Sequence, residues 1–330
     1  MEPEQFQEIF TRLEAEVRKV IVGHDDVIRK VLIAFFAGGH VLLEGVPGLG
    51  KTLLVKSLSQ ALGISFKRIQ FTPDLMPSDI VGTEVLAESN GRREFQFKQG
   101  PIFAHVVLAD EINRATPKTQ SAVLEAMEER QVTVFGESHT LESPFIVLAT
   151  QNPIELEGTY PLPEAQLDRF FFKLLVSPPS PAELREILQR TTGAETGDAK
   201  RVLPDDGVQT IAAMKLLLRQ VLLAPPIEDY VVRLVHATQP SVQDGKAANP
   251  PSPVKEYLRF GSSPRGAQSI ILGAKGNALA EGRVHVSYGD VEKVIYPALR
   301  HRIILNFQAE AENVTADQIL AQVVKQVARN

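Results

Sequence analysis

The residues Gly45-Val-Pro-Gly-Leu-Gly-Lys51-Thr52 have the types and the spacing of a loop that holds phosphate groups. Glycines let a backbone wrap around an anion, and the N–H groups of successive residues then point inward at the phosphates. In such a loop, Lys51 reaches the β- and γ-phosphates and the hydroxyl of Thr52 holds Mg²⁺. The loop therefore predicts nucleotide binding, but it does not indicate which reaction the phosphates undergo.

Two adjacent carboxylates, Asp110 and Glu111, follow an apolar run that begins at Val106. Successive side chains of a strand point to opposite faces, so two acids at a strand end can serve two purposes. We expect Asp110 to bind Mg²⁺, directly or through water, and Glu111 to orient and deprotonate a water that attacks the γ-phosphate. A kinase would need an acceptor site instead, so this pair favours hydrolysis over phosphate transfer.

These residues must be positioned by an α/β scaffold, which the sequence predicts for residues 1–177. Five short apolar segments are typical of strands buried on both faces of a parallel sheet, and helical segments fall between them. This alternation predicts a doubly wound α/β layer. The predicted strands cover residues 41–43, 66–71, 106–108, 145–149 and 170–176, and the helices include residues 6–20, 25–36, 51–62 and 118–130.

A Pro-rich linker at residues 177–181 marks a predicted domain boundary, after which residues 178–330 have almost wholly helical periodicity. We therefore expect a second, smaller and all-helical domain. A polar, Pro-rich stretch at residues 239–254 interrupts it and is more typical of a surface loop than of a recognition motif. The predicted helices cover residues 181–191, 206–222, 228–238, 264–281 and 288–302.

Two segments of the first domain alternate like β-hairpins, at about residues 84–101 and 131–144. The first carries an Asn-Gly pair, the strongest short signal for a tight hairpin turn. Each hairpin could decorate the edge of the sheet or project toward another subunit or a substrate. The sequence leaves both interpretations open.

The composition excludes several other classes of protein. The net charge of −5, from 35 basic and 40 acidic residues, lacks the basic excess of a general nucleic-acid binder. The chain has no cysteine, and its seven histidines are scattered, so neither disulfides nor a zinc site is expected. The first residues are acidic and polar, unlike a signal peptide, and no apolar run approaches the roughly 20 residues of a membrane span. We expect a cytoplasmic protein.

Further motifs make the chain similar to the AAA+ ATPases and, more narrowly, to their MoxR branch, over nearly the whole length. The resemblance implies a P-loop αβα sandwich with a parallel sheet, followed by a helical lid domain. The matching stretches are Ile21-Val-Gly23, residues 71–79, Asp110-Glu-Ile-Asn-Arg114, residues 149–170 and Gly261-Ser-Ser-Pro-Arg265.

The resemblance also implies roles for three residues outside the phosphate loop. Asn152 matches sensor 1, an amide that helps to hold the attacking water beside Glu111. Arg169 matches the arginine finger, which enters the site of the neighbouring subunit, although Arg114 remains a rival interface arginine. Arg265 matches sensor 2, which reports on the γ-phosphate either in its own subunit or in the adjacent one, and both alternatives stay open.

The same resemblance extends to the base of the nucleotide and to the two hairpins. Val22 and Gly23 match the segment that packs against adenine, while His24 stands where glutamine is common, which leaves the base contact in doubt. The hairpins match inserts that typically line the central face of a ring. The candidate partner contacts there are Phe95, Phe97, Arg92 and Arg93. The expected nucleotide-binding residues are Val22, Gly23, Gly45, Pro47, Gly48, Leu49, Gly50, Lys51, Thr52 and Leu53, and the expected metal ligands are Thr52 and Asp110.

The resemblance implies a Mg²⁺-dependent ATPase that converts ATP to ADP in a ring, a hexamer in our expectation, and acts as a chaperone-like remodeller of protein clients. It also implies a partner with a von Willebrand factor A-type domain. The alternatives are a nucleic-acid motor, a metal-chelatase motor subunit and a nucleotide-gated scaffold that barely hydrolyses ATP. The acidic net charge argues against the nucleic-acid motor. Glu111 and Arg169 argue against the scaffold.

Overall fold

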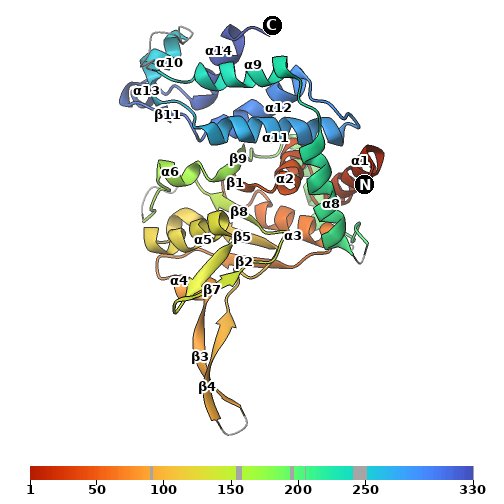
Figure 1. The fold of residues 1–330 in the computed structure, drawn as a ribbon, viewed down its shortest axis with the longest axis vertical. Coiled ribbons are helices and arrows are strands. Elements are labelled where there is room, and N and C mark those ends of the chain that lie inside the picture. The colour runs from red at the N-terminus through yellow and green to blue at the C-terminus, as the bar shows by residue number, and fades with distance from the viewer. Residues whose placement is uncertain (90–91, 154–157, 194–196, 205, 241–250, 330) are drawn as a thin grey trace.

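The computed structural model of the chain describes residues 1–330 apart from residues 90–91, 154–157, 194–196, 205, 241–250 and 330. At its centre lies a five-stranded, wholly parallel sheet in the order β2-β5-β8-β1-β9 (Figure 1). All five predicted strands are present, with ends that differ by at most two residues from expectation. They are β1 (His40–Glu44), β2 (Phe66–Gln70), β5 (Val106–Asp110), β8 (Ile146–Gln151) and β9 (Phe170–Leu175).

Helices cover both faces of this sheet, as the continuously apolar strands require. Val41 and Leu43 of β1 pack into one buried cluster with α1 (Pro3–Val20), α2 (Asp25–Ala37) and α3 (Lys51–Leu62). Leu42, between them, belongs to the opposite cluster, which contains α4 (Pro77–Val81) and α5 (Pro117–Glu129). The alternation of neighbouring strand residues between the two clusters confirms the predicted αβα sandwich.

The strand order brings three chain segments to one edge of the sheet. β8 lies between β1 and β5, so the carboxyl ends of these three strands are neighbours. The phosphate loop follows β1, the acid pair ends β5, and Asn152 follows β8. In open parallel sheets, ligands bind outside the carboxyl ends of the strands, where the strand order reverses. The topology therefore gathers the predicted site residues although more than 100 positions of sequence separate them.

The second half of the chain is built mainly from helices. In the view of Figure 1, α9 (Pro225–His236), α11 (Pro264–Ala280) and α12 (Tyr288–Leu299) lie above the sheet, whereas α8 (Gly207–Gln220) runs beside it. The longest described helix there, α11, packs against α1 and α2 of the α/β part, and residues of both parts share one buried cluster. The boundary at residue 177 stays a prediction. The helices predicted from periodicity correspond to α7 (Pro181–Thr191), α8 (Gly207–Gln220), α9 (Pro225–His236), α11 (Pro264–Ala280) and α12 (Tyr288–Leu299).

The sequence did not predict several elements of this half. They are α10 (Ser252–Tyr257), α13 (Phe307–Ala311), α14 (Ala316–Gln326) and a small antiparallel pair, β10 (Leu258–Phe260) with β11 (Ile304–Leu305). The predicted surface loop at residues 239–254 falls mostly outside the described residues, and its last part begins α10. α10, α13 and the two strands span too few turns or strand residues to show a clear hydrophobic period. Length does not explain the omission of α14, which has 11 residues, as many as the predicted α7.

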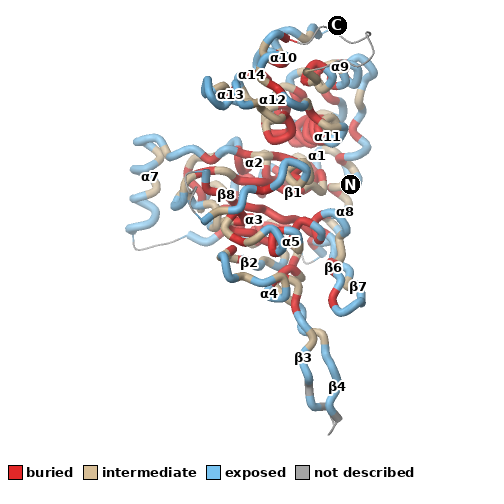
Figure 2. The backbone as a smooth tube through the Cα atoms, turned by 90° about the vertical axis from the view of Figure 1, so that its left-hand side faces the viewer, coloured by how far each residue is buried: buried red, intermediate tan, exposed pale blue. Residues whose placement is uncertain are grey.

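Two antiparallel hairpins leave the α/β part, one from β3 (Gly82–Ser89) and β4 (Arg92–Gln99), and one from β6 (Gln131–Val134) and β7 (Glu137–Thr140). The first extends away from the body of the molecule (Figure 1), and Figure 2 shows it almost wholly exposed. The expected Asn-Gly turn lies outside the described residues, as does the side chain of Arg92. Within the described part of the chain, no helix is both long and apolar enough to cross a membrane.

Candidate nucleotide-binding and hydrolysis site

The loop between β1 and α3 has the backbone conformation that its glycines permit. Gly48 and Gly50 lie in the left-handed region, at φ +83° and +74°, which side chains other than glycine adopt rarely. Open space adjoins both residues, whereas a Cβ at Gly45 would come within 2.5 Å of the carbonyl oxygen of Val176. The loop therefore packs tightly against the end of β9 at its start and lies open at its two central glycines.

Lys51 begins α3, and its ammonium donates a hydrogen bond back to the carbonyl oxygen of Gly45. Burial lowers the pKa of Lys51, while Asp110, Glu111 and Glu44 act in the opposite direction. A partly desolvated cation in the cradle of a loop attracts an anion strongly, because fewer water molecules screen its charge. The geometry at Lys51 therefore suits phosphate oxygens.

Asp110 presents two carboxylate oxygens with different surroundings. Its Oδ1 accepts a hydrogen bond from Thr150 Oγ1 at 2.6 Å, and its Oδ2 lies 3.4 Å from Thr52 Oγ1. Oxygen atoms of a hydroxyl and a carboxylate are the kind of ligand that Mg²⁺ prefers, the rest of its shell being water and phosphate. Among the described residues, no group of three or more His, Cys, Asp or Glu side chains could hold a metal ion by itself. Thr52 and Asp110 therefore fit a magnesium ion bound together with phosphates.

Glu111 adopts a left-handed backbone conformation at φ +58°, which is uncommon for a residue with a side chain. Its carboxylate Oε2 accepts a hydrogen bond from Gln70 Nε2 at 2.9 Å and pairs with Arg114 Nη1 at 3.2 Å. Its backbone N–H donates to Thr150 Oγ1 at 2.8 Å. The predicted base is thus held at the end of β5 by neighbours on three segments, and Arg114 contacts this acid within its own chain.

Asn152 lies at the same edge of the sheet, directly after β8, and is only 5% exposed. The part of the motif that follows it includes residues 154–157, which lie outside the described residues. Asn152 follows the strand next to β5, so Lys51, Asp110, Glu111 and Asn152 all belong to the edge formed by the ends of β1, β8 and β5.

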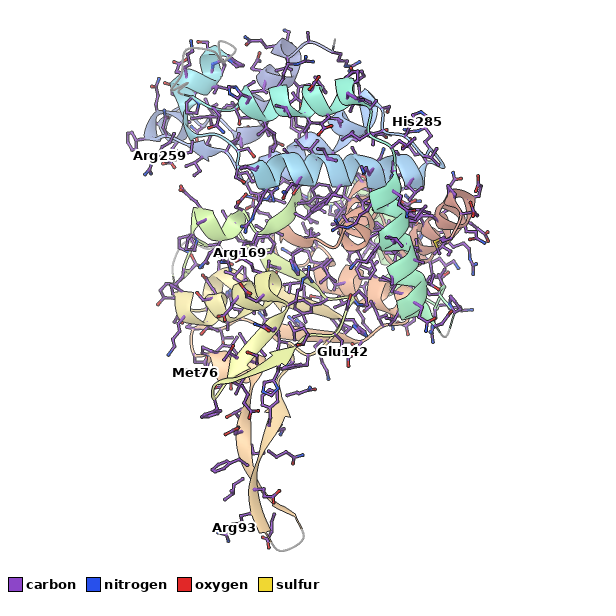
Figure 3. The ribbon with its side chains drawn as sticks, in the orientation of Figure 1. Met76, Arg93, Glu142, Arg169, Arg259 and His285 are labelled. Carbon is purple, nitrogen blue, oxygen red and sulfur yellow. The ribbon has the colours of Figure 1, made fainter. Side chains whose placement is uncertain are left out.

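Arg169 lies at the opposite edge of the sheet. It directly precedes β9, and Phe170 pairs with His40 at the start of β1, whereas the phosphate loop follows the end of β1. A strand of five residues at about 3.3 Å per residue separates the two edges by about 16 Å. Arg169 is labelled in Figure 3. Its guanidinium donates to the carbonyl oxygen of Leu124 at 2.8 Å. Arg169 therefore does not complete the phosphate site of its own chain.

Arg265 joins Arg169 at this edge. The second residue of α11, it donates from Nη2 to Glu128 Oε1 at 2.7 Å, while Arg169 Nη2 lies 2.6 Å from the other oxygen of the same carboxylate. Both arginines line a hollow of about 280 Å³ between the sheet and α11. The structure thus brings the two predicted arginines together on one carboxylate and separates both from Lys51.

The remaining predicted nucleotide contacts belong to the loop, to the first turn of α3 and to the segment between α1 and α2. Pro47 and Leu53 are exposed, and Leu49 is half-buried. Val22 is buried, and Gly23, at φ +69°, lies so close to α7 that a Cβ there would come within 2.5 Å of Glu183 Oε1. The start of α7 follows β9 closely, so this segment adjoins the carboxyl edge of the sheet. His24 also has a positive φ, +57°.

Comparison with known proteins agrees with this geometry. Residues 40–172 match the family described as "ATPase family associated with various cellular activities (AAA)", and residues 252–323 match the "AAA lid domain". The chain is 45% identical over 316 residues to Chaperone MoxR1 of Mycobacterium tuberculosis, which covers 95% of this chain and 80% of that protein. The chain belongs to the MoxR family of AAA+ ATPases.

Two further relatives of this MoxR-family chain span nearly their whole length. Protein MoxR of Methylorubrum extorquens is 32% identical over 329 residues, covering 94% of this chain and 92% of that protein. The crystal structure of a candidate ATPase from Cytophaga hutchinsonii superimposes with a TM-score of 0.88 at 37% identity, covering 99% of this chain and 96% of the other. The predicted family and fold class are confirmed, and membership of an ATPase family implies that this chain binds nucleotide.

Three contacts of this MoxR-family site were missed from the sequence. Thr150 bonds to both Asp110 and Glu111. Glu128 binds both Arg169 and Arg265. Arg68 of β2 pairs with Asp110. Thr150 lies within the matched Ala149-Thr-Gln-Asn152 run, which was the available signal for it. Glu128 and Arg68 are ordinary charged residues on a helix and on an edge strand, and no spacing rule distinguishes them from solvated side chains.

Proposed function

We propose that this MoxR-family ATPase hydrolyses ATP in sites completed between neighbouring subunits of a ring, which is a hexamer in this proposal. The observation that carries the proposal is the separation of Arg169 and Arg265 from Lys51 and Glu111 across the sheet. When one subunit follows another head to tail, the arginine edge of each faces the phosphate edge of the next, and a closing rotation makes a ring.

In the proposed reaction, Lys51 binds the β- and γ-phosphates, and the open loop N–H groups surround them. Glu111 takes a proton from the water whose oxygen attacks the γ-phosphorus, and the bond to the ADP oxygen breaks. The amide of Asn152 holds that water.

Thr52 and Asp110 are the proposed ligands of Mg²⁺, which supplies neutralisation of the phosphate charge when it is bound. Arg169 enters the site of the neighbouring subunit and stabilises the charge of the transition state. Arg265, held on the same carboxylate as Arg169, accompanies it into that site. This placement supports the proposal that Arg265 acts in trans, one of the two alternatives left open by the sequence.

We further propose that hydrolysis drives the remodelling of a protein client in the cytoplasm, together with a partner that contains a von Willebrand factor A-type domain. The name of the M. tuberculosis relative, a chaperone, supports a protein client. The β3–β4 hairpin is the proposed contact. Its Phe95 is 74% exposed, and Arg93 lies near its far end (Figure 3). An exposed phenylalanine on a projecting hairpin is a natural anchor for apolar client segments.

Client capture by the Glu111→Gln variant in ATP tests this proposal, because a complex that binds but does not hydrolyse ATP should retain its client. Adding Phe95→Ser should lower the amount of recovered client by about tenfold or more, as expected for an aromatic anchor that a client buries when it binds. Phe307→Ser, a matched change at a phenylalanine that is 83% exposed on α13, should leave recovery unchanged. Equal recovery with both substitutions would contradict the role of the hairpin, and ATP-dependent recovery of nucleic acid instead of protein would contradict the client class.

A further inference from the structure

Arg68 places a second cation in the nucleotide site, beside the one that the phosphate loop supplies. Its Nε and Nη2 both donate to Asp110 Oδ2, at 2.9 Å and 2.7 Å. This oxygen is also the one that lies 3.4 Å from Thr52 Oγ1, whereas Oδ1 is engaged by Thr150. Arg68 therefore holds the side of Asp110 that faces the other proposed magnesium ligand.

The fold explains why an arginine reaches this position. β2 is an edge strand that pairs in parallel with β5, and Gln70, two residues beyond Arg68, is aligned with Asp110. The Arg68 side chain is 47% exposed and can leave toward solvent, while that of Asp110 is only 10% exposed. A carboxylate so far removed from water needs a counterion. Lys51 is close enough to Asp110 that this carboxylate counteracts the lowering of the Lys51 pKa by burial, and Arg68 is the cation that bonds directly to Asp110.

We propose that Arg68 is the resident counterion of Asp110 in the nucleotide-free subunit and competes with Mg²⁺ for Asp110 Oδ2, so that it sets the metal affinity of the site. A divalent ion bound between Thr52 and Asp110 repels a guanidinium on the same oxygen. Arg68 must therefore move when the metal binds. It keeps a partner after leaving, because its Nη2 also donates to Gln70 Oε1.

This proposal rests on the proposed function only in taking Thr52 and Asp110 as the metal ligands. The competition predicts that removing the charge of Arg68 strengthens metal binding. In the Arg68→Gln variant, the Mg²⁺ concentration at half-saturation should fall about three- to tenfold, the range for loss of one competing, partly buried charge-assisted pair. The measurement is a Mg²⁺ titration of the full chain with a fluorescent ADP derivative bound, which requires no turnover.

Lys67→Gln is the matched control, because Lys67 is the exposed neighbour of Arg68 in the same strand and the substitution changes the net charge equally. Half-saturation should stay at the wild-type value in that variant. A second measurement remains informative if Arg68→Gln is less stable than the wild type. Mg²⁺ with ADP should raise the Tm of Arg68→Gln more than it raises the Tm of the wild type. Unchanged or weaker metal binding in Arg68→Gln would overturn the competition.

The Asp110→Asn variant separates failure of this proposal from failure of the metal site itself. If Thr52 and Asp110 hold Mg²⁺, Asp110→Asn should lose most of the metal affinity whatever Arg68 does. Wild-type affinity in Asp110→Asn would show that the metal site is wrong. Loss of affinity in Asp110→Asn, together with no gain in Arg68→Gln, would show that the site is right and the role of Arg68 is wrong.

Discussion

Replacing Arg169 by alanine is expected to lower kcat for ATP hydrolysis by about 10³-fold or more, the size of effect that removal of an arginine finger produces. The nucleotide affinity of each subunit should change little, since Arg169 lies at the edge of the sheet opposite its own phosphate loop. Steady-state turnover at saturating ATP, with nucleotide binding measured separately by fluorescence, tests both parts of this expectation.

Two controls distinguish a catalytic effect of Arg169 from a structural one. The side chain also bonds to Leu124 and Glu128, so the variant should be compared with wild type in Tm and in its state of assembly. Arg185→Ala, on the exposed surface of α7, removes the same charge without these contacts and should keep full turnover. An assembled Arg169→Ala variant that retains more than half of the wild-type kcat would rule out a finger at this position.

Replacing Glu111 by glutamine is expected to lower kcat by about 10² to 10⁴-fold, the usual contribution of a general base. An amide of nearly the same shape cannot take the proton of the attacking water. Binding of ATP should persist, because the loop and Lys51 are untouched. Single-turnover hydrolysis and equilibrium binding measure the two effects independently.

Glu310→Gln, at an exposed glutamate on α13 of the helical half, makes the same chemical change away from the site and should leave turnover unaltered. Turnover in Glu111→Gln that equals the wild-type rate would instead favour a nucleotide-gated scaffold, in which hydrolysis is incidental. The contacts of Gln70 and Arg114 with the Glu111 carboxylate would then have no catalytic purpose.

The parts of the fold that the sequence predicts well depend on local patterns. The phosphate loop and the five buried strands have strong signals over a few residues, and the strand ends then place Asp110, Glu111 and Asn152 together through the strand order. The single-turn helix α13 and the short pair β10 and β11 do not extend far enough to show a period. Their positions follow from packing against the rest of the helical part.

The contacts that the sequence does not predict are those between charged side chains far apart in the chain. Arg68 is 42 positions from Asp110, and Arg265 is 137 positions from Glu128. Which of several surface acids such an arginine meets depends on the register of an edge strand or on how α11 docks beside α5. For the same reason, the proposal that Arg265 acts in trans could be made only once the fold was known.

The most direct test of the shared site mixes the two inactive variants, Glu111→Gln and Arg169→Ala, in equal amounts under assembling conditions. Each Arg169→Ala subunit keeps its own base and can receive the intact arginine of a Glu111→Gln neighbour. Random head-to-tail assembly then completes about one site in four, so about a quarter of the wild-type ATPase activity should return. Mixing Arg169→Ala with a variant that carries both Glu111→Gln and Arg169→Ala supplies no intact arginine and should restore no ATPase activity. Activity that stays at the sum of the two inactive variants, in rings confirmed to contain both, would contradict catalysis across the subunit interface.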